Sequence, residues 1–420
     1  MSEWKETNLG KMCENISYGY TASAKHDGKS PKFLRITDIV SQAINWGTVP
    51  ACEATSEIIE KYLLKDGDIV IARTGATTGY NKTIKNCQHI AIFASYLIRY
   101  KIDFDIADPY FIGYILQSKR WFSFVEAISG GSAQPGANAK QFASFQFLLP
   151  PLPEQKAIAG VLSSLDDKIN LLHRQNKTLE SMAETLFRQW FIEEYENRSQ
   201  PSPNLSQGES SKNKEEAEDD WEEVKLINCL ELIIDYRGKT PLKLGYNWSE
   251  EGIPAISAKN IKNGKIVKPE TYKYVSLELY KKWMKTELKK GDIIITSEAP
   301  LGEMYYLNSE EKYVLSQRLF AIRTNDYFTS EYLYFYLKSP RGQYLLKSRA
   351  SGTTVQGIRQ EELRKIRVVK PENNKMQEFS TVVSSQMDKI SKNSKQITIL
   401  EQLRDTLLPK LMSGEVRVEY

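Results

Sequence analysis

The sequence predicts an α+β protein in which two globular, mixed and mostly β domains are joined by two long antiparallel coiled-coil helices, arranged as a pseudo-twofold internal repeat. Three observations predict this fold. A strict heptad pattern of apolar residues runs through residues 154–195, the same pattern returns 221 residues later, and each pattern follows short apolar strands separated by turns. A heptad pattern is typical of a helix that lies along another helix, so the repeated unit is one domain followed by one long helix.

The first long helix is predicted to start behind the segment LPPLP at residues 149–153, because the first helical turn does not need the N–H that proline lacks. Its seam residues are spaced in alternating steps of four and three: Ile158, Leu162, Leu165, Ile169, Leu172, Asn176, Leu179, Ala183, Leu186 and Trp190. At about 1.5 Å per residue the run is roughly 60 Å long, which is too long for an ordinary globular helix.

The second long helix repeats every seam position of the first. Adding 221 to each number gives Phe379, Val383, Gln386, Ile390, Asn393, Ile397, Leu400, Arg404, Leu407 and Leu411. Each helix alone could be a buried amphipathic helix of a larger core. The matched offset favours a coiled coil of two repeats instead.

The rest of the chain divides around these helices. We expect a first domain at residues 1–149, its helix at 150–196, a polar flexible linker at 197–220, a second domain at 221–370, its helix at 371–413 and a tail at 414–420. The domains match segment by segment. The segment LKDGDIVIAR at residues 64–73 resembles LKKGDIIITS at 288–297, and SGGSAQPG at 129–136 resembles ASGTTVQG at 350–357.

Composition excludes several classes of protein. The 420 residues are 41% hydrophobic and 26% charged with a net charge of +4, which permits nucleic-acid binding without arguing for it. No long apolar run or signal-peptide core occurs, so a cytoplasmic protein with no membrane segment is expected. Four scattered cysteines and three histidines indicate idle thiols and no metal site.

Catalytic motifs are also missing from the sequence. No nucleotide-binding loop or aminomethyltransferase tetrad occurs. Asp292 and Glu298 are not followed by the lysine of a metal-dependent nuclease, and Asp66 with Asp68 is interpreted as a turn. A stand-alone nuclease or methylase is therefore disfavoured.

The duplicated order of motifs resembles the specificity (S) subunit of type I restriction–modification enzymes. The resemblance is carried by residues 149–169, the matching 376–390, the closing LLPKLMSGEV at 407–416, and the segments GDIVIARTGATTG and SGGSAQ. It implies a non-catalytic subunit whose two target-recognition domains each bind half of a bipartite site in double-stranded DNA. It also implies two modification subunits that supply S-adenosylmethionine chemistry at adenine, and restriction subunits that use ATP and Mg²⁺. This chain itself would hold no cofactor.

Hydrogen-bond donors on exposed loops are the expected DNA contacts, because base edges specify sequence and phosphates set position. In the first domain the candidates are Tyr18, Tyr20, Lys25, Lys29, Lys32, Arg35, Arg73, Thr74, Thr77, Thr78, Ser132, Gln134 and Lys140. In the second domain they are Tyr236, Arg237, Lys239, Lys259, Asn260, Thr296, Ser297, Arg318, Thr353, Thr354, Gln356 and Arg359. Each could instead be solvated surface or part of a local turn.

Four apolar residues near the helix ends, namely Trp190, Phe191, Leu408 and Met412, are candidates for docking the modification subunits. The alternative is that they close the coiled coil against a domain.

The positions of the polar residues in the seam predict how the two helices are aligned in the coiled coil. If the helices pack antiparallel with their ends aligned, facing positions have numbers that add up to 569, and the only seam asparagines, Asn176 and Asn393, fall in one layer. Such a pair would fix the register, since a slip would leave a buried amide unpaired. The coiled coil would then set the distance between the two half-sites. The competing hypotheses are a stand-alone DNA-binding regulator and a tandem adaptor that binds protein.

Overall fold

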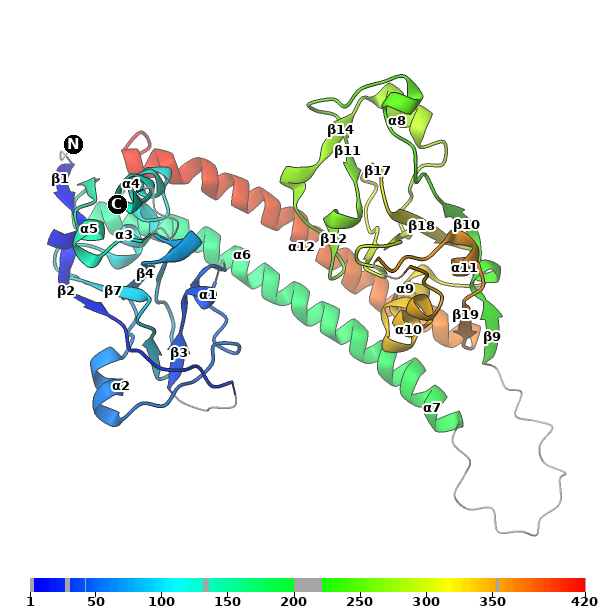
Figure 1. Cartoon of the computed structure of the whole chain (residues 1–420), viewed down its shortest axis with the longest axis horizontal. Coiled ribbons are helices and arrows are strands. Elements are labelled where there is room, and N and C mark those ends of the chain that lie inside the picture. Colours follow the sequence, from blue (N-terminus) through cyan, green and yellow to red (C-terminus); the bar gives the residue numbers. More distant parts are fainter. Residues whose placement is uncertain are drawn as a thin grey trace, which may run out of the picture. The chain divides into compact units, whose positions relative to one another are not determined.

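The computed structural model describes residues 4–26, 31–41, 43–130, 136–199, 221–352 and 355–419. It forms two compact units, Met1–His173 with Gln396–Tyr420, and Arg174–Lys395. Two long helices contribute to both units: α6 (Leu152–Phe187) and α12 (Asn373–Ser413) (Figure 1). Helix α6 continues through a π-helical turn, η3 (Arg188–Glu193), into α7 (Glu194–Ser199), so the helical run extends three residues into the segment expected to be a linker. Residues 200–220 of that segment lie outside the described residues.

The first domain is built around a four-stranded antiparallel sheet in the order β2-β7-β4-β5. A parallel pair β3-β6 and an antiparallel pair β1-β8 complete its described strands. The strands are β1 (Lys5–Asn8), β2 (Cys13–Tyr18), β3 (Lys32–Leu34), β4 (Ile69–Ala72), β5 (Asn81–Thr83), β6 (Ala91–Phe93), β7 (Leu97–Ile102) and β8 (Gln146–Leu149). The helices are α1 (Ile36–Ile39), α2 (Ser56–Tyr62), α3 (Pro109–Ile115), α4 (Lys119–Ser129) and α5 (Ala139–Ala143).

The second domain repeats this plan with the four-stranded sheet β10-β18-β15-β16 and the pair β19-β9. Its parallel pair β11-β17 corresponds to β3-β6, and it adds the strand β14 beside β11 and the hairpin β12-β13. The strands are β9 (Glu222–Lys225), β10 (Leu230–Ile234), β11 (Ile253–Ile256), β12 (Ile261–Lys262), β13 (Lys265–Ile266), β14 (Lys273–Val275), β15 (Ile293–Thr296), β16 (Met304–Tyr306), β17 (Val314–Leu315), β18 (Leu319–Thr324) and β19 (Arg367–Lys370). The helices are α8 (Leu277–Trp283), α9 (Ser330–Lys338), α10 (Pro340–Ser348) and α11 (Gln360–Arg364).

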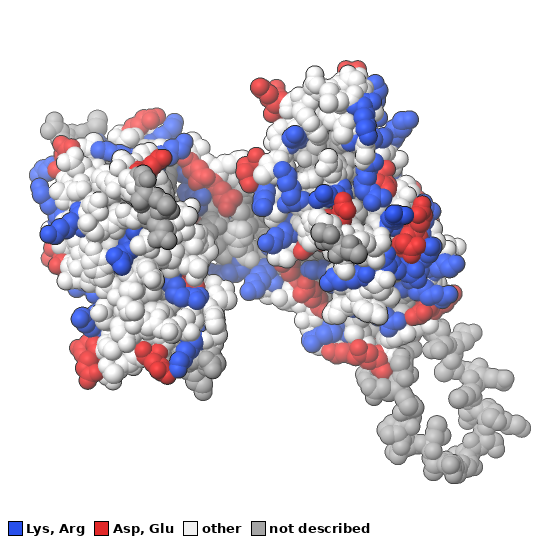
Figure 2. Space-filling model, viewed as in Figure 1, with Lys and Arg blue, Asp and Glu red and all other residues white. Residues whose placement is uncertain are grey.

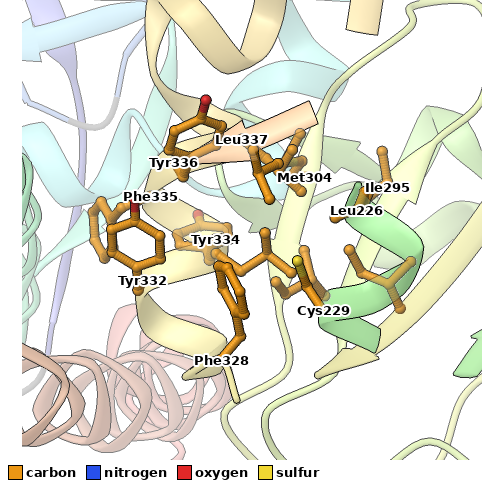
Figure 3. Close-up of a cluster of buried hydrophobic side chains, with 14 of the residues drawn as sticks. Leu226, Cys229, Ile295, Met304, Phe328, Tyr332, Tyr334, Phe335, Tyr336 and Leu337 are labelled. Atoms are coloured by element: carbon orange, nitrogen blue, oxygen red, sulfur yellow. The ribbon is translucent and has the colours of Figure 1, made fainter. Parts of the chain in front are cut away.

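In each unit the domain packs directly on the paired helices. Figure 3 shows the cluster in the second unit, where the aromatic residues of α9 lie among side chains of β15, β16 and the turn η4 (Leu226–Cys229). Phe187 and Phe379 of the long helices belong to the same cluster. In the first unit Ile158, Leu162 and Leu411 pack with the first domain's core. The apolar seam is therefore shared between helix pairing and domain attachment.

The helices run antiparallel within each unit, and both units keep the predicted facing positions. Ile169 and Leu172 cluster with Ile397 and Leu400 in the first unit. Arg404 is the one charged residue of the seam, and its guanidinium donates to Asp166 at 2.9 Å and also to Asp405. Asp166 in turn accepts a hydrogen bond from the Tyr114 hydroxyl at 2.7 Å. The half-buried arginine is thus held by a carboxylate of the opposite helix.

The polar groups that the sequence left without a catalytic role have structural roles. Asp292 is fully buried, and both of its oxygens accept from the Arg323 guanidinium at 2.8 Å. Its counterpart Asp68 lies 3.8 Å from Arg99. All four cysteines are free, and burial raises the pKa of the Cys13 and Cys229 thiols to about 12. Within the described ranges no helix is long and apolar enough to cross a membrane, and no His, Cys, Asp and Glu cluster could hold a metal ion.

Candidate nucleic-acid interface

A junction of two loops lies at the end of the first domain's central sheet. Thr74, which follows strand β4, forms a β-bridge with Gly136, and the Ala137 N–H donates to the Arg73 carbonyl at 3.0 Å. The end of strand β2 joins them. The Arg73 guanidinium lies 5.2 Å from the centre of the Tyr18 ring, and the Tyr18 hydroxyl accepts from the Ala139 N–H at 3.1 Å. Three segments far apart in the sequence therefore meet at one place.

The second domain has the same junction with different side chains. Glu298, which follows strand β15, forms a β-bridge with Gly357, and the Ile358 N–H donates to the Ser297 carbonyl at 2.9 Å. These residues are equivalent to Thr74, Gly136, Ala137 and Arg73 of the first domain at the sequence offsets of 224 and 221. The backbone of the junction is thus duplicated, while the side chains that it presents are not.

The junction of the second domain borders a groove of about 720 Å³. Arg318 stands at its edge, with a backbone φ of 66° and an ion pair of 2.9 Å from its Nε to Glu298. Arg237 lies against the Phe320 ring, 4.0 Å from its centre, and is paired with Asp235. Arg359 is exposed at the start of α11. Three guanidinium groups, which suit guanine edges and phosphates, therefore line one groove. On the face shown in Figure 2, Lys and Arg side chains gather over this domain with acidic side chains between them.

The structure brings part of the predicted set together at the two junctions. Tyr18, Arg73 and Thr74 meet at the first, where the exposed Lys140 follows Ala139 in the chain. Around the second junction lie Arg237, Arg318, Gln356 and Arg359. The other described candidates lie elsewhere in the two domains. Two of them form ion pairs, Lys25 with Glu53 and Arg35 with Asp38. Two others donate to backbone carbonyls, Lys32 to that of Val49 and Lys239 to that of Trp283. Tyr20 packs against Tyr62, the Tyr236 hydroxyl accepts from the Thr286 N–H, Thr77 ends the turn η2 (Gly75–Thr77), and Lys259 is exposed in the turn η6 (Ala258–Asn260).

Four predictions of an exposed donor are wrong, because Thr78, Asn260, Thr296 and Ser297 are buried. The Asn260 amide donates to the Val267 and Lys268 carbonyls, and the Thr296 hydroxyl accepts from the Glu303 N–H. The side chains of Asn260 and Thr296 therefore stabilise the conformation of their own loops. Five further candidates, Lys29, Ser132, Gln134, Thr353 and Thr354, lie outside the described residues.

The two acidic residues of the second junction, Asp235 and Glu298, are not among the contacts predicted from the sequence. The predicted contacts were all hydrogen-bond donors, whereas a carboxylate accepts a hydrogen bond from cytosine and also orients an arginine. The available signal was positional. Glu298 stands at the same offset of 224 from Thr74 as Ser297 does from Arg73.

Comparison with known proteins identifies the fold's family. The family model for the type I restriction modification DNA specificity domain matches the chain twice, over residues 1–181 and 218–403. The chain belongs to this family.

Relatives of the type I specificity family cover most of the chain. The MjaIX specificity subunit from Methanocaldococcus jannaschii is 28% identical over 74% of this chain and 69% of the relative. The HindI specificity subunit from Haemophilus influenzae is 24% identical over 99% of this chain and 100% of its own. The crystal structure of the S subunit of a type I restriction–modification system from M. genitalium shares the fold, with a TM-score of 0.63, 17% identity and coverage of 97% and 96% of the two chains.

The four apolar residues that were predicted to dock the modification subunits all pack against a domain core. Phe191 is buried between Tyr332, Phe379 and Trp221, so it closes the coiled coil against the second domain. Trp190 is half-buried against the same core, while Leu408 and Met412 are half-buried against the first domain's core. The structure therefore supports the alternative for Phe191, in which it packs the coiled coil against a domain and does not dock a modification subunit.

Proposed function

We propose that this chain is the DNA sequence-recognition subunit of a type I restriction–modification enzyme, with one half of a bipartite site bound by each domain. The observation that carries the proposal is the duplicated junction. One backbone arrangement presents Arg73, Thr74 and Tyr18 in the first domain and Glu298, Arg318 and Arg237 in the second. Base edges are distinguished by the pattern of donors and acceptors that they meet. Two different side-chain sets on one scaffold therefore suit two different half-sites.

We infer that the chain itself is non-catalytic and that its partners supply the chemistry. Adenine methylation would use S-adenosylmethionine bound by two modification subunits, and the restriction subunits would use ATP and Mg²⁺. The role of this chain is to bind the site and to hold these subunits on the DNA.

A second duplicated feature supports docking of two modification subunits. Val161 and Leu403 in the first unit and Val382 and Met182 in the second unit are exposed apolar residues of the long helices. Each lies one residue before a seam position, and they match in pairs at the offset of 221. In an antiparallel pair of helices such positions share one side of the seam. Exposed Leu171 and Ile399 enlarge the set in the first unit.

Glutamate at these positions is expected to remove the modification subunits one at a time. Met182→Glu with Val382→Glu should leave a complex with one modification subunit, because charged groups are disfavoured in the core of an interface. Val161→Glu with Leu403→Glu should remove the other. The measurement is native mass spectrometry of the co-expressed complex. His173→Glu is the matched control, since His173 is exposed on the opposite side of the seam, one residue after Leu172. Retention of both subunits by the quadruple variant would refute this surface.

Methylome sequencing tests the proposed function. Cells that express this chain with its modification subunit should carry methyladenine at one bipartite motif, while cells that express either protein alone should carry none. Purified alone, the chain should neither methylate nor cleave DNA. Methylation at a continuous motif, or by the chain alone, would contradict the proposal.

A further inference from the structure

The first turn of α6 carries a buried charge that is held by the chain's other end. Glu154 is 0% exposed and accepts hydrogen bonds from the Trp4 indole N–H at 3.3 Å and from Nη2 of Arg417 at 2.7 Å. Arg417 follows the end of α12, and its guanidinium lies 5.5 Å from the centre of the Trp4 ring. We name Trp4, Glu154 and Arg417 the first clasp.

The second unit has a clasp at the equivalent place with the opposite polarity. Lys375 stands 221 residues after Glu154, in the first turn of α12, and Trp221 stands in the repeat where Trp4 does. Lys375 forms an ion pair with Glu194, which follows the end of α6, and lies 6.0 Å from the centre of the Trp221 ring. The first clasp thus has a carboxylate at the helix start and a cation from the other helix's end. The second clasp, Trp221, Lys375 and Glu194, has the reverse.

Three further polar contacts join the two long helices in or beside the seam. The Asn393 amide donates to the Asn176 carbonyl oxygen at 2.9 Å, and the two side chains are 1% and 3% exposed. The Asn176 amide also lies 3.4 Å from the Ser394 hydroxyl. Arg404 is held by Asp166, as described above. Each of these contacts joins a residue of the first repeat's helix to one of the second.

Pairing of α6 with a second copy of α6 would break all of these contacts. In the native seam, facing residues have numbers that add up to 569. If a second α6 took the place of α12, each partner residue would be the one 221 positions earlier, so facing residues would have numbers that add up to 348. Asn176 then faces Leu172 twice, and Asp166 meets Ala183 where Arg404 stood. At the clasps Glu154 meets a second carboxylate, Glu194.

A pair of α12 helices fails in the complementary way. Asn393 faces Ile397, Arg404 meets Met387, and Lys375 meets the cation of Arg417. Buried amides without partners and like charges in contact are both strongly unfavourable. The apolar layers alone would not distinguish mixed from same-repeat pairs, because leucine and isoleucine fill these layers in either kind of pair.

We propose that the opposite polarity of the two clasps, together with the asparagine layer, makes each long helix accept the helix of the other repeat and reject a second copy of itself. The inference concerns the pairing of the repeats and stands apart from the proposed DNA recognition. Its effect is that the two helices of one chain pair with each other and do not pair with the same helix of a second copy.

The test uses the whole chain with a protease site placed within residues 200–220, cleaved after folding so that both repeats remain present. The cleaved chain is unfolded in urea, refolded and weighed by native mass spectrometry, which resolves the three pairings because the repeats differ in mass. The wild type should return the mixed pair with at least about a hundredfold excess over same-repeat pairs, since each buried mismatch costs about tenfold. A statistical mixture of the three pairings would overturn the proposal.

The decisive variant gives both clasps the same polarity. Glu154→Lys with Arg417→Glu reverses the first clasp, so helix starts are cationic and helix ends anionic in both repeats, and Asn176→Leu with Asn393→Leu removes the polar layer. Same-repeat pairs should rise at least about tenfold. The matched control reverses both clasps and keeps the two asparagines. It carries Glu154→Lys, Arg417→Glu, Lys375→Glu and Glu194→Lys, and it should form the mixed pair as the wild type does. If the decisive variant formed no more same-repeat pairs than the wild type, the proposal would be overturned.

A measurement on the intact chain covers the case in which a variant fails to refold. Ile169→Cys with Leu400→Cys should form a disulfide within one chain, because these residues pack in one layer. Ile169→Cys with Leu179→Cys lie on the same helix and could bridge only between two copies of α6. A disulfide-linked dimer of this second variant would show same-repeat pairing and overturn the proposal.

Discussion

Asp292→Ala is expected to lower the free energy of unfolding of the second domain by about 3–5 kcal/mol, because it leaves a largely buried arginine without its counter-charge. Arg323 is 12% exposed in its side chain, and Asp292 holds both its Nε and its Nη2 at 2.8 Å. Asp292 also accepts the Lys289 N–H at 2.8 Å, which fixes the turn into strand β15. Urea unfolding of the whole chain, followed by far-UV circular dichroism, measures the change.

The matched control for Asp292 is an aspartate in an exposed ion pair of the same unit. Asp388 pairs with Lys290 at 2.7 Å, with side chains 44% and 46% exposed. Asp388→Ala should cost less than about 1 kcal/mol, since water screens such pairs. Equal losses of unfolding free energy in the two variants would show that the buried pair of Asp292 and Arg323 stabilises the domain no more than an exposed pair does.

Arg318→Ala is expected to reduce methylation at the half-site of the second domain by about 10- to 100-fold while leaving discrimination in the other half unchanged, because an arginine contact to a base edge contributes about 1–3 kcal/mol. Arg318 is exposed at the groove and is oriented by Glu298 at 2.9 Å. Arg73→Ala should have the converse effect on the half-site of the first domain. The measurement is the methylation rate of the assembled enzyme on duplexes with single base pairs changed in each half.

Lys281→Ala provides the control for these arginine variants, since Lys281 is an exposed cation of α8 in the second domain that lies outside the groove. It should leave the preference for every base pair unchanged. If Arg318→Ala lowered the rate equally on all duplexes, Arg318 would contact phosphate and would not read sequence.

Much of the fold follows from local sequence patterns. A heptad has a fixed geometry, so the seam, its antiparallel register and the meeting of Asn176 with Asn393 can be worked out from residue numbers alone. The repeat offset likewise reveals which strands are equivalent. The charged clasps could not be foreseen, because Glu154 and Arg417 lie 263 residues apart and meet only through the packing of the chain's two ends.

The candidate site was harder to predict because polarity does not determine exposure. Ser297 follows the apolar strand β15 and resembles part of a solvated turn, yet it is buried, and the Ile358 N–H of the loop before α11 donates to its carbonyl. Phe191 resembles an interface anchor on a helical wheel, but the second domain encloses it. In both cases a segment distant in the sequence supplies the cover, and no local pattern records it.

The two junctions, in contrast, are recoverable from the repeat once the pairing is known. Residues that follow β4 and β15 are equivalent at one offset, and the loops before α5 and α11 at another. Positions that keep the backbone bridge but change their side chains are the natural candidates for specificity.

The most direct test of independent recognition by the two domains is exchange of residues 221–370 for the matching segment of another type I specificity subunit, followed by methylome sequencing with the native modification subunit. Independent recognition by the two domains predicts a new bipartite motif in which one half is replaced, while the other half and the length of the unread spacer are unchanged. A motif altered in both halves would contradict it.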